Sequence, residues 1–123
     1  MIAFSELDSQ TQFAQQLRED DPSPVTLVNT FVVPEGKMDE VIAAFQKDSA
    51  IMKAAPGFIS AQLYRGTGSS RVLVNVAVWE SARALSEAFH SNEFQSTLGL
   101  FPDGTVAHPH LVQPMAVAGL CTA

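Results

Sequence analysis

Two apolar runs, residues 25–33 and 71–80, are the most strongly predicted strands of the chain. Side chains alternate along a strand, so the odd-numbered residues of each run share one face of a sheet and the even-numbered residues share the other. Both faces are largely apolar, which predicts burial on the two sides of the sheet. Each odd-numbered face also carries one carboxamide, Asn29 in the first run and Asn75 in the second.

The middle of the chain shows a helical period followed by a hairpin pattern. Apolar residues recur about every 3.6 positions from Met38 to Met52, which predicts a helix that stops before Pro56. Residues 58–65 alternate as a strand, and the glycine- and serine-rich loop after them predicts a hairpin with the strand over 71–80.

The last third of the chain predicts two short helices and a final strand. Ser81 is a suitable cap for a helix carrying Leu85, and Asn92 for a further turn. Residues 106–120 predict a strand whose prolines favour an edge position or a bulge. The order β-α-β-β-α-β predicts an α+β, ferredoxin-like fold with an antiparallel sheet and helices on one face. Because the other face is also apolar, we expect a homodimer in which two sheets pack face to face.

The N-terminal segment is interpreted as an extension of this domain. Its apolar spacing predicts an amphipathic helix over residues 4–18 with Ser5 as a cap, and the charged, proline-rich stretch after it is typical of a linker. We therefore expect an N-terminal extension and linker over residues 1–24, a domain over 25–118 and a tail over 119–123.

Composition and charge narrow the classes of partner. Of the 123 residues, 46% are hydrophobic, a high share for a small monomer, which favours self-association. The net charge is −6 and no Lys/Arg cluster is present, which argues against nucleic-acid and anionic-membrane partners. The only cysteine, Cys121, permits no internal disulfide, and no secretory signal or spanning segment is apparent, so we expect a cytoplasmic protein.

The two carboxamides are the leading candidates for a binding site. The first and third strands are adjacent in a ferredoxin-like sheet, so Asn29 and Asn75 are expected to meet at one cavity lined by Trp79, Phe31 and Phe45. An enclosed amide without a partner costs about 1–3 kcal/mol. Each carboxamide therefore either bonds to an irregular backbone group or serves a ligand.

Tyr64 and the histidines are the remaining candidates. Tyr64 lies late in its strand and either points into the cavity as a donor or lies at its rim. His90 is either a solvated residue at a helix end or a base. His108 and His110 have no nearby carboxylate or cysteine partner, so no metal site is predicted.

Short motifs in a fixed order resemble those of one protein family. Pro34-Glu35-Gly36 opens the first long helix, Pro56-Gly57-Phe58 opens the second strand, and Asn75 is followed by Trp79-Glu80-Ser81. Over residues 25–118 this combination resembles the antibiotic biosynthesis monooxygenase family. The resemblance implies a dimeric α/β barrel.

The resemblance also implies a reaction and a set of site residues. Well-understood members of this family oxidise anthrones or quinols with O2 and without metal or flavin, so no cofactor is implied. The implied catalytic residues are Asn75, Trp79 and Tyr64. Together with the cavity expected from the strand order, this makes Asn29, Phe31, Phe45, Leu85 and His90 the expected substrate-binding residues. In the anthrone-oxidising branch a histidine occupies the position of Tyr64 and a tyrosine that of Leu85, so half of that constellation is absent here.

Three functions follow as hypotheses. The primary hypothesis is a homodimeric, cofactor-independent monooxygenase that oxidises an aromatic quinol or anthrone-like molecule with O2. A non-catalytic dimeric barrel that binds a small apolar ligand fits the absent histidine and tyrosine equally well. The haem-degrading branch shares Asn29, but its helix tryptophan falls at Ala88 and its haem-ligating histidine at Leu98, which leaves a haem without its axial ligand.

Overall fold

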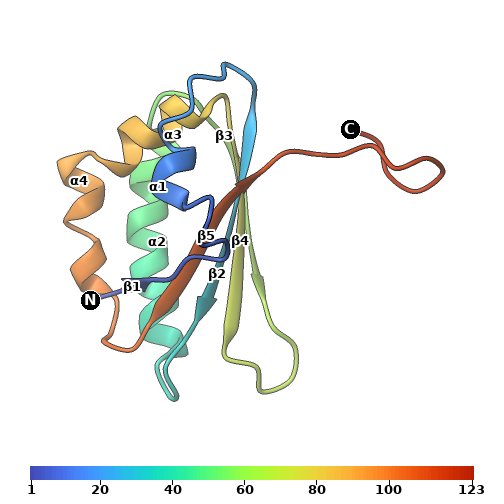
Figure 1. Ribbon diagram of the computed structural model, residues 1–123. Helices are drawn as coiled ribbons and strands as arrows, with labels where there is room; N and C mark the ends of the chain where they lie inside the picture. The colour runs from blue at the N-terminus through green and yellow to red at the C-terminus, as the bar shows by residue number, and fades with distance from the viewer.

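Five strands form one mixed sheet, and the helices lie on one of its faces (Figure 1). The computed structural model describes residues 1–123. The strands are β1 (Ala3–Phe4), β2 (Val25–Val32), β3 (Phe58–Arg65), β4 (Val72–Trp79) and β5 (Val106–Val112), in the spatial order β1-β5-β2-β4-β3. β1 pairs in parallel with β5, and the other pairs are antiparallel. The predicted ferredoxin-like order is confirmed, with β1 as an additional strand at the edge.

Four helices and one 3-10 turn cover the inner face of the sheet. They are α1 (Phe13–Gln16), α2 (Met38–Ala54), α3 (Ala82–Phe89), α4 (Asn92–Gln95) and η1 (Leu98–Leu100). As predicted, Ser81 caps α3, because its Oγ accepts a hydrogen bond from the Ala84 N–H at 3.1 Å. The predicted cap of α4 is wrong: Ser91, rather than Asn92, accepts from the Phe94 N–H at 3.2 Å. None of these helices combines the length and apolar character needed to cross a membrane.

The two faces of the sheet differ in what covers them. The odd-numbered side chains of β2 and β4 point to the helices and are mostly buried in two clusters, one around Phe31 and Leu73 and the other around Trp79 and Leu85. The even-numbered side chains lie on the outer face, which no helix covers (Figure 1). These half-buried apolar residues are Val28, Val32, Val72, Val74, Val76 and Val78.

The N-terminal segment packs along β5 and does not form the helix predicted over residues 4–18. Only Phe13–Gln16 is helical, and the N–H of Ser5 instead donates to a β5 carbonyl at 2.8 Å. The Gln16 carboxamide accepts from the N–H of Leu111 at 2.8 Å and donates to its carbonyl at 3.0 Å. Bonding to the open edge of β5 satisfies backbone groups that a separate surface helix would leave unpaired, which explains the difference.

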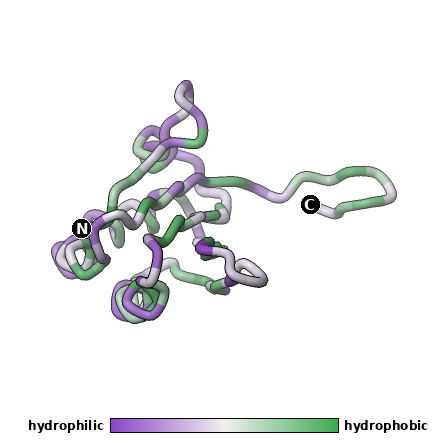
Figure 2. The backbone as a smooth tube through the Cα atoms, turned by 90° about the horizontal axis from the view of Figure 1, so that it is seen from below, coloured by the Kyte–Doolittle hydropathy of each residue, from purple (hydrophilic) through white to green (hydrophobic).

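β5 ends at Val112 rather than continuing to residue 120 as predicted. The β2–β5 ladder ends at the pair Thr26 and Val112, one residue after β2 begins at Val25, so residues 114–123 have no strand opposite them. These residues leave the body as an extended arm with apolar stretches (Figures 1 and 2). Met115 and Leu120 are 78% and 83% exposed, and one bridge between Val117 and Cys121 closes the turn of the arm.

One carboxyl group is enclosed between α2 and the sheet. Asp48 is 7% exposed, and its Oδ1 accepts a hydrogen bond from the Ser49 hydroxyl at 2.9 Å. Burial raises the pKa of Asp48 from 3.8 to about 7, and the Ser49 hydroxyl opposes part of that rise. Because the pKa is higher in the folded chain than in the unfolded chain, the folded state binds the proton more tightly. This contribution to stability is complete below pH 3.8 and is lost as the pH rises through about 7.

Gly57 sets the start of β3 and is expected to tolerate no side chain. Its φ is +89°, and a Cβ there would lie 2.4 Å from the Ala84 Cβ. We expect Gly57→Ala to lower the free energy of unfolding by about 2–4 kcal/mol, from left-handed backbone strain plus overpacking. Gly68→Ala is the matched control, because φ is +65° there with nothing within 4 Å of the added Cβ. Equal losses in urea denaturation would contradict close packing at Gly57.

Asp48→Asn is expected to change how stability depends on pH. The shift of the Asp48 pKa from 3.8 to about 7 corresponds to a loss of up to about 4 kcal/mol in the free energy of unfolding between those pH values. The introduced carboxamide does not ionise. In urea denaturation, the free energy of unfolding of the variant should therefore rise relative to that of the wild type as the pH rises from 4 to 8. Asp39→Asn, on the exposed side of α2, is the control: its free energy of unfolding should differ from that of the wild type by the same amount at every pH between 5 and 8. Parallel curves for Asp48→Asn and the wild type would mean that Asp48 titrates normally.

Candidate functional site

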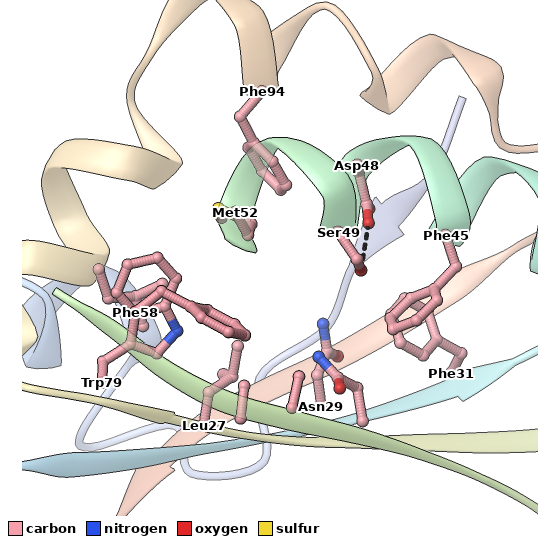
Figure 3. Close-up of a pocket in the computed structure, with 14 residues that line it drawn as sticks. Leu27, Asn29, Phe31, Phe45, Asp48, Ser49, Met52, Phe58, Trp79 and Phe94 are labelled. Atoms are coloured by element: carbon pink, nitrogen blue, oxygen red, sulfur yellow. Dashed lines mark hydrogen bonds between the residues drawn. The ribbon is translucent and has the colours of Figure 1, made fainter. Parts of the chain in front are cut away.

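A cavity of about 60 Å³ lies between α2 and the inner face of β2, β3 and β4 (Figure 3). Ten of the 14 residues around it are hydrophobic, and the polar ones are Asn29, Asp48, Ser49 and Asn75. One enclosed water needs roughly 10–15 Å³ of such space, so the cavity has room for a few water molecules. The exposed Ala61 of β3 is part of the lining, so the cavity approaches the surface at the β3 edge.

Asn29 and Asn75 are direct cross-strand neighbours. In the β2–β4 ladder Asn29 lies opposite Asn75, with Leu27 opposite Ala77 on one side and Phe31 opposite Leu73 on the other. Opposed residues on one face of an antiparallel pair have Cβ atoms about 4.5–5.5 Å apart. The register therefore holds the two carboxamides side by side on the floor of the cavity.

Both carboxamides have an acceptor that the protein leaves unused. The Oδ1 atoms of Asn29 and Asn75 are enclosed and have no hydrogen-bond partner. An unpaired buried acceptor costs about 1–3 kcal/mol and is rare in native proteins. In Figure 3 the Asn29 side chain rises from the sheet toward α2, so its amide donors as well as its acceptor lie beside the cavity. The sequence left two roles open for each carboxamide, a hydrogen bond to the backbone or contact with a ligand. In the structure neither Oδ1 atom accepts a hydrogen bond from the backbone.

Aromatic side chains form both ends of the cavity. Trp79 is 1% exposed and meets Phe58 edge to face, with ring centroids 5.5 Å apart and planes at 90°. Phe31 and Phe45 meet in a similar way at 6.2 Å and 83°. The structure thus brings most of the sequence-predicted site residues together around one cavity: Asn29, Phe31, Phe45, Asn75, Trp79 and Leu85.

Tyr64 and His90 do not line the cavity, contrary to the roles expected for them. The β3–β4 register shifts between Phe58 and Ser60, so Phe58 faces inward opposite Trp79 while Tyr64, opposite Val74, faces outward and is 56% exposed. Without that irregularity, alternation would have placed Tyr64 on the same face as Phe58. His90 ends α3 at the surface, where its Nδ1 lies 2.8 Å from the Ser86 carbonyl oxygen.

Asp48 is the functional candidate that sequence reasoning missed. It lies on α2 across the cavity from Asn29 (Figure 3), and no other charged side chain is among the residues of the lining. With its pKa raised to about 7 by burial, it is partly ionised near neutral pH. The signal was present in the helical period: steps of three and four from Val41 through Phe45 to Met52 pass through position 48, where a core helix should carry an apolar residue.

The arrangement places hydrogen-bonding groups and one titratable carboxyl group against apolar walls. The carboxamides can donate to an oxygen atom and accept from a hydroxyl, Asp48 can exchange a proton, and the walls favour flat apolar rings. No group of three or more His, Cys, Asp or Glu side chains comes together as a metal site would require.

Solved structures share this fold along most of the chain. SnoaB, a cofactor-independent oxygenase from Streptomyces nogalater, is 25% identical with a TM-score of 0.71, covering 79% of this chain and 98% of that chain. A candidate monooxygenase from Shewanella loihica PV-4 is 28% identical with a TM-score of 0.64, covering 77% and 97%. Rv0793 from Mycobacterium tuberculosis, at 20% identity and a TM-score of 0.63, covers 79% and 100% and shows the fold alone.

Comparison at the level of sequence gives a family and no individual relative. No curated protein sequence matches the chain. The model of one family matches residues 24–99, which include β2, α2, β3, β4, α3 and α4 and hence all 14 residues around the cavity. On this match, the chain belongs to the antibiotic biosynthesis monooxygenase family.

Proposed function

We propose that the protein is a cofactor-independent monooxygenase that oxidises an aromatic quinol or an anthrone-like molecule with O2 in the cavity beneath α2. The observation that carries the proposal is the opposed pair Asn29 and Asn75, whose Oδ1 atoms are enclosed without partners in a cavity lined by Trp79. The likeness to SnoaB, which is a cofactor-independent oxygenase, supports the same class of reaction.

The reaction needs an electron-rich substrate and a site that stabilises its anion. Loss of a proton from a hydroxyl or an acidic C–H gives an anion whose charge rests on oxygen and on the reacting carbon. Carboxamide N–H groups aimed at that oxygen stabilise the anion, and apolar walls exclude water while the carbon meets O2. For an anthrone, a CH2 group becomes C=O, the second oxygen atom leaves as water, and the substrate supplies all the electrons.

Substrate entry requires the cavity to widen. Ligand pockets usually measure roughly 300–1,000 Å³, whereas the closed cavity measures about 60 Å³. Met52 and Phe58 lie in its wall near the β3 edge, and an unbranched methionine side chain can change rotamer easily. Displacement of these two side chains opens a path past Ala61 to the surface.

The proposed active form is a homodimer built on the outer face of the sheet. The valines of β2 and β4 form an apolar face that no helix covers, and the arm over residues 113–123 exposes Met115 and Leu120. A second sheet packed against this face, with the arm of each chain on its partner, buries both surfaces in one isologous contact.

Replacement of either carboxamide is expected to slow oxygen uptake. With metal-free protein and a panel of quinols and anthrones, an oxygen electrode should record uptake by the wild type. Asn75→Ala and Asn29→Ala should each lower kcat by about 10- to 1,000-fold, because each removes a donor to the developing oxyanion. Asn92→Ala, the same change on the exposed side of α4, should leave kcat unchanged. Tight binding of the panel without oxygen uptake would instead indicate a non-catalytic binding protein.

Disruption of the outer face is expected to give a monomer. Val76→Glu places a charge in the middle of the valine face, and ending the chain after Gln113 removes the arm. Light scattering during size-exclusion chromatography should give twice the chain mass for the wild type and one chain mass for Val76→Glu. Ala43→Glu, on the exposed side of α2, is the matched control and should stay dimeric. A monomeric wild type would contradict the proposed assembly.

A further inference from the structure

We infer that Asp48 is the general base of this site, taking a proton from the hydroxyl or acidic C–H of the bound molecule and returning it to the peroxide formed with O2. The inference rests on the proposed function and assigns the proton transfer that the carboxamides and Trp79 cannot perform. Its basis is the position of Asp48 in the cavity, opposite the two amides that hold the substrate oxygen.

The cavity contains one side chain able to act as a base. Its lining comes from β2, β3, β4, α2, α3 and α4, and among these residues only Asp48 is charged or titrates near neutral pH. The Ser49 hydroxyl is its one side-chain hydrogen-bond partner, and the other polar residues of the lining are the uncharged Asn29 and Asn75. Tyr64, expected as a donor, and His90, expected as a base, lie outside the cavity.

The place of Asp48 in the helix is unfavourable for a purely structural residue. It occupies an apolar stripe of α2 and is 7% exposed, and Ser49 supplies its one side-chain hydrogen bond. A carboxylate enclosed without a cation loses hydration that one hydroxyl does not replace. An apolar residue would fill this position at lower free energy, so the carboxyl group makes the fold less stable than it could be.

The electrostatic environment suits the proposed role. Desolvation raises the pKa of Asp48 to about 7, and the hydrogen bond from Ser49 lowers it. A general base works best when its pKa lies near the working pH, because a usable fraction is ionised and the base is still strong enough to accept a proton. An exposed aspartate, with a pKa near 3.9, would be a far weaker base.

The proton and the electrons balance over the cycle. The Asp48 carboxylate takes one proton from the substrate, whose electron pair stays on the carbon–oxygen framework. A C–O bond then forms between the carbanion and O2, and protonated Asp48 gives its proton to the terminal peroxide oxygen. The remaining C–H proton leaves as the O–O bond breaks, which gives the new carbonyl group and water.

Asp48→Asn is expected to remove the base while keeping the fold. At pH 7 we expect kcat for oxygen uptake to fall by about 100-fold or more, in line with the usual contribution of general bases. Raising the pH above the pKa of the free substrate should restore activity toward that of the wild type, because the substrate then enters already ionised. Asp39→Asn, on the exposed side of the same helix, should leave kcat at its wild-type value at every pH.

Ser49→Ala provides an independent test, because it should shift the pH profile of kcat, which a purely structural role of Asp48 would leave unchanged. Loss of the hydroxyl removes the hydrogen bond that lowers the pKa of Asp48. The acidic limb of the kcat profile should therefore move to higher pH, with the plateau at high pH preserved.

The outcomes separate this inference from the function on which it rests. No oxygen uptake by the wild type with any quinol or anthrone removes the proposed function and the role of Asp48 together. Uptake by the wild type with an unchanged pH profile in Asp48→Asn and Ser49→Ala leaves the function in place and overturns the role of Asp48. Quenching of Trp79 fluorescence by an anthraquinone, which resembles the oxidised product, checks that each variant still binds.

Discussion

The register of β2 against β4 is the constraint on which the whole site depends. It sets Asn29 opposite Asn75 and points both toward α2, and the same ladder puts Trp79 at one end of the cavity. A slip of one residue would turn Asn75 and Trp79 to the outer face and bring valines under the helices. Burial of Leu73 and Trp79, at opposite ends of β4, opposes such a slip. The backbone bonds that hold the domain together therefore also position the site.

Around this floor the fold maintains several unfavourable polar groups in an apolar space. Two amide oxygens lack partners, and Asp48 has only the Ser49 hydroxyl. Each group lowers stability by itself, and their concentration in one cavity is the pattern expected where a polar site is built into an apolar core. Aromatic contacts at both ends compensate through burial, and Gly57 lets β3 begin close to α3 so that Phe58 reaches Trp79.

Most of the domain could be predicted because its signals are local. β-branched runs identified β2 and β4, and alternation from Val25 to Phe31 identified the inner face on which Asn29 lies. The position of Tyr64 could not be predicted, because a one-residue irregularity early in β3 reverses every later side chain. The N-terminal segment escaped prediction because its structure comes from the edge of β5, nearly a hundred residues away. Asp48 was visible in the pattern, as a charge in the apolar stripe of α2.

A crystal structure with a bound, non-oxidisable anthraquinone would test the central claim most directly. We expect the rings between Trp79 and Phe31, one ring oxygen within hydrogen-bonding distance of Asn29 and Asn75, and the Asp48 carboxyl group facing the reacting edge. Met52 and Phe58 should be displaced toward the β3 edge. A ligand bound elsewhere, with the closed cavity unchanged, would contradict a catalytic site beneath α2.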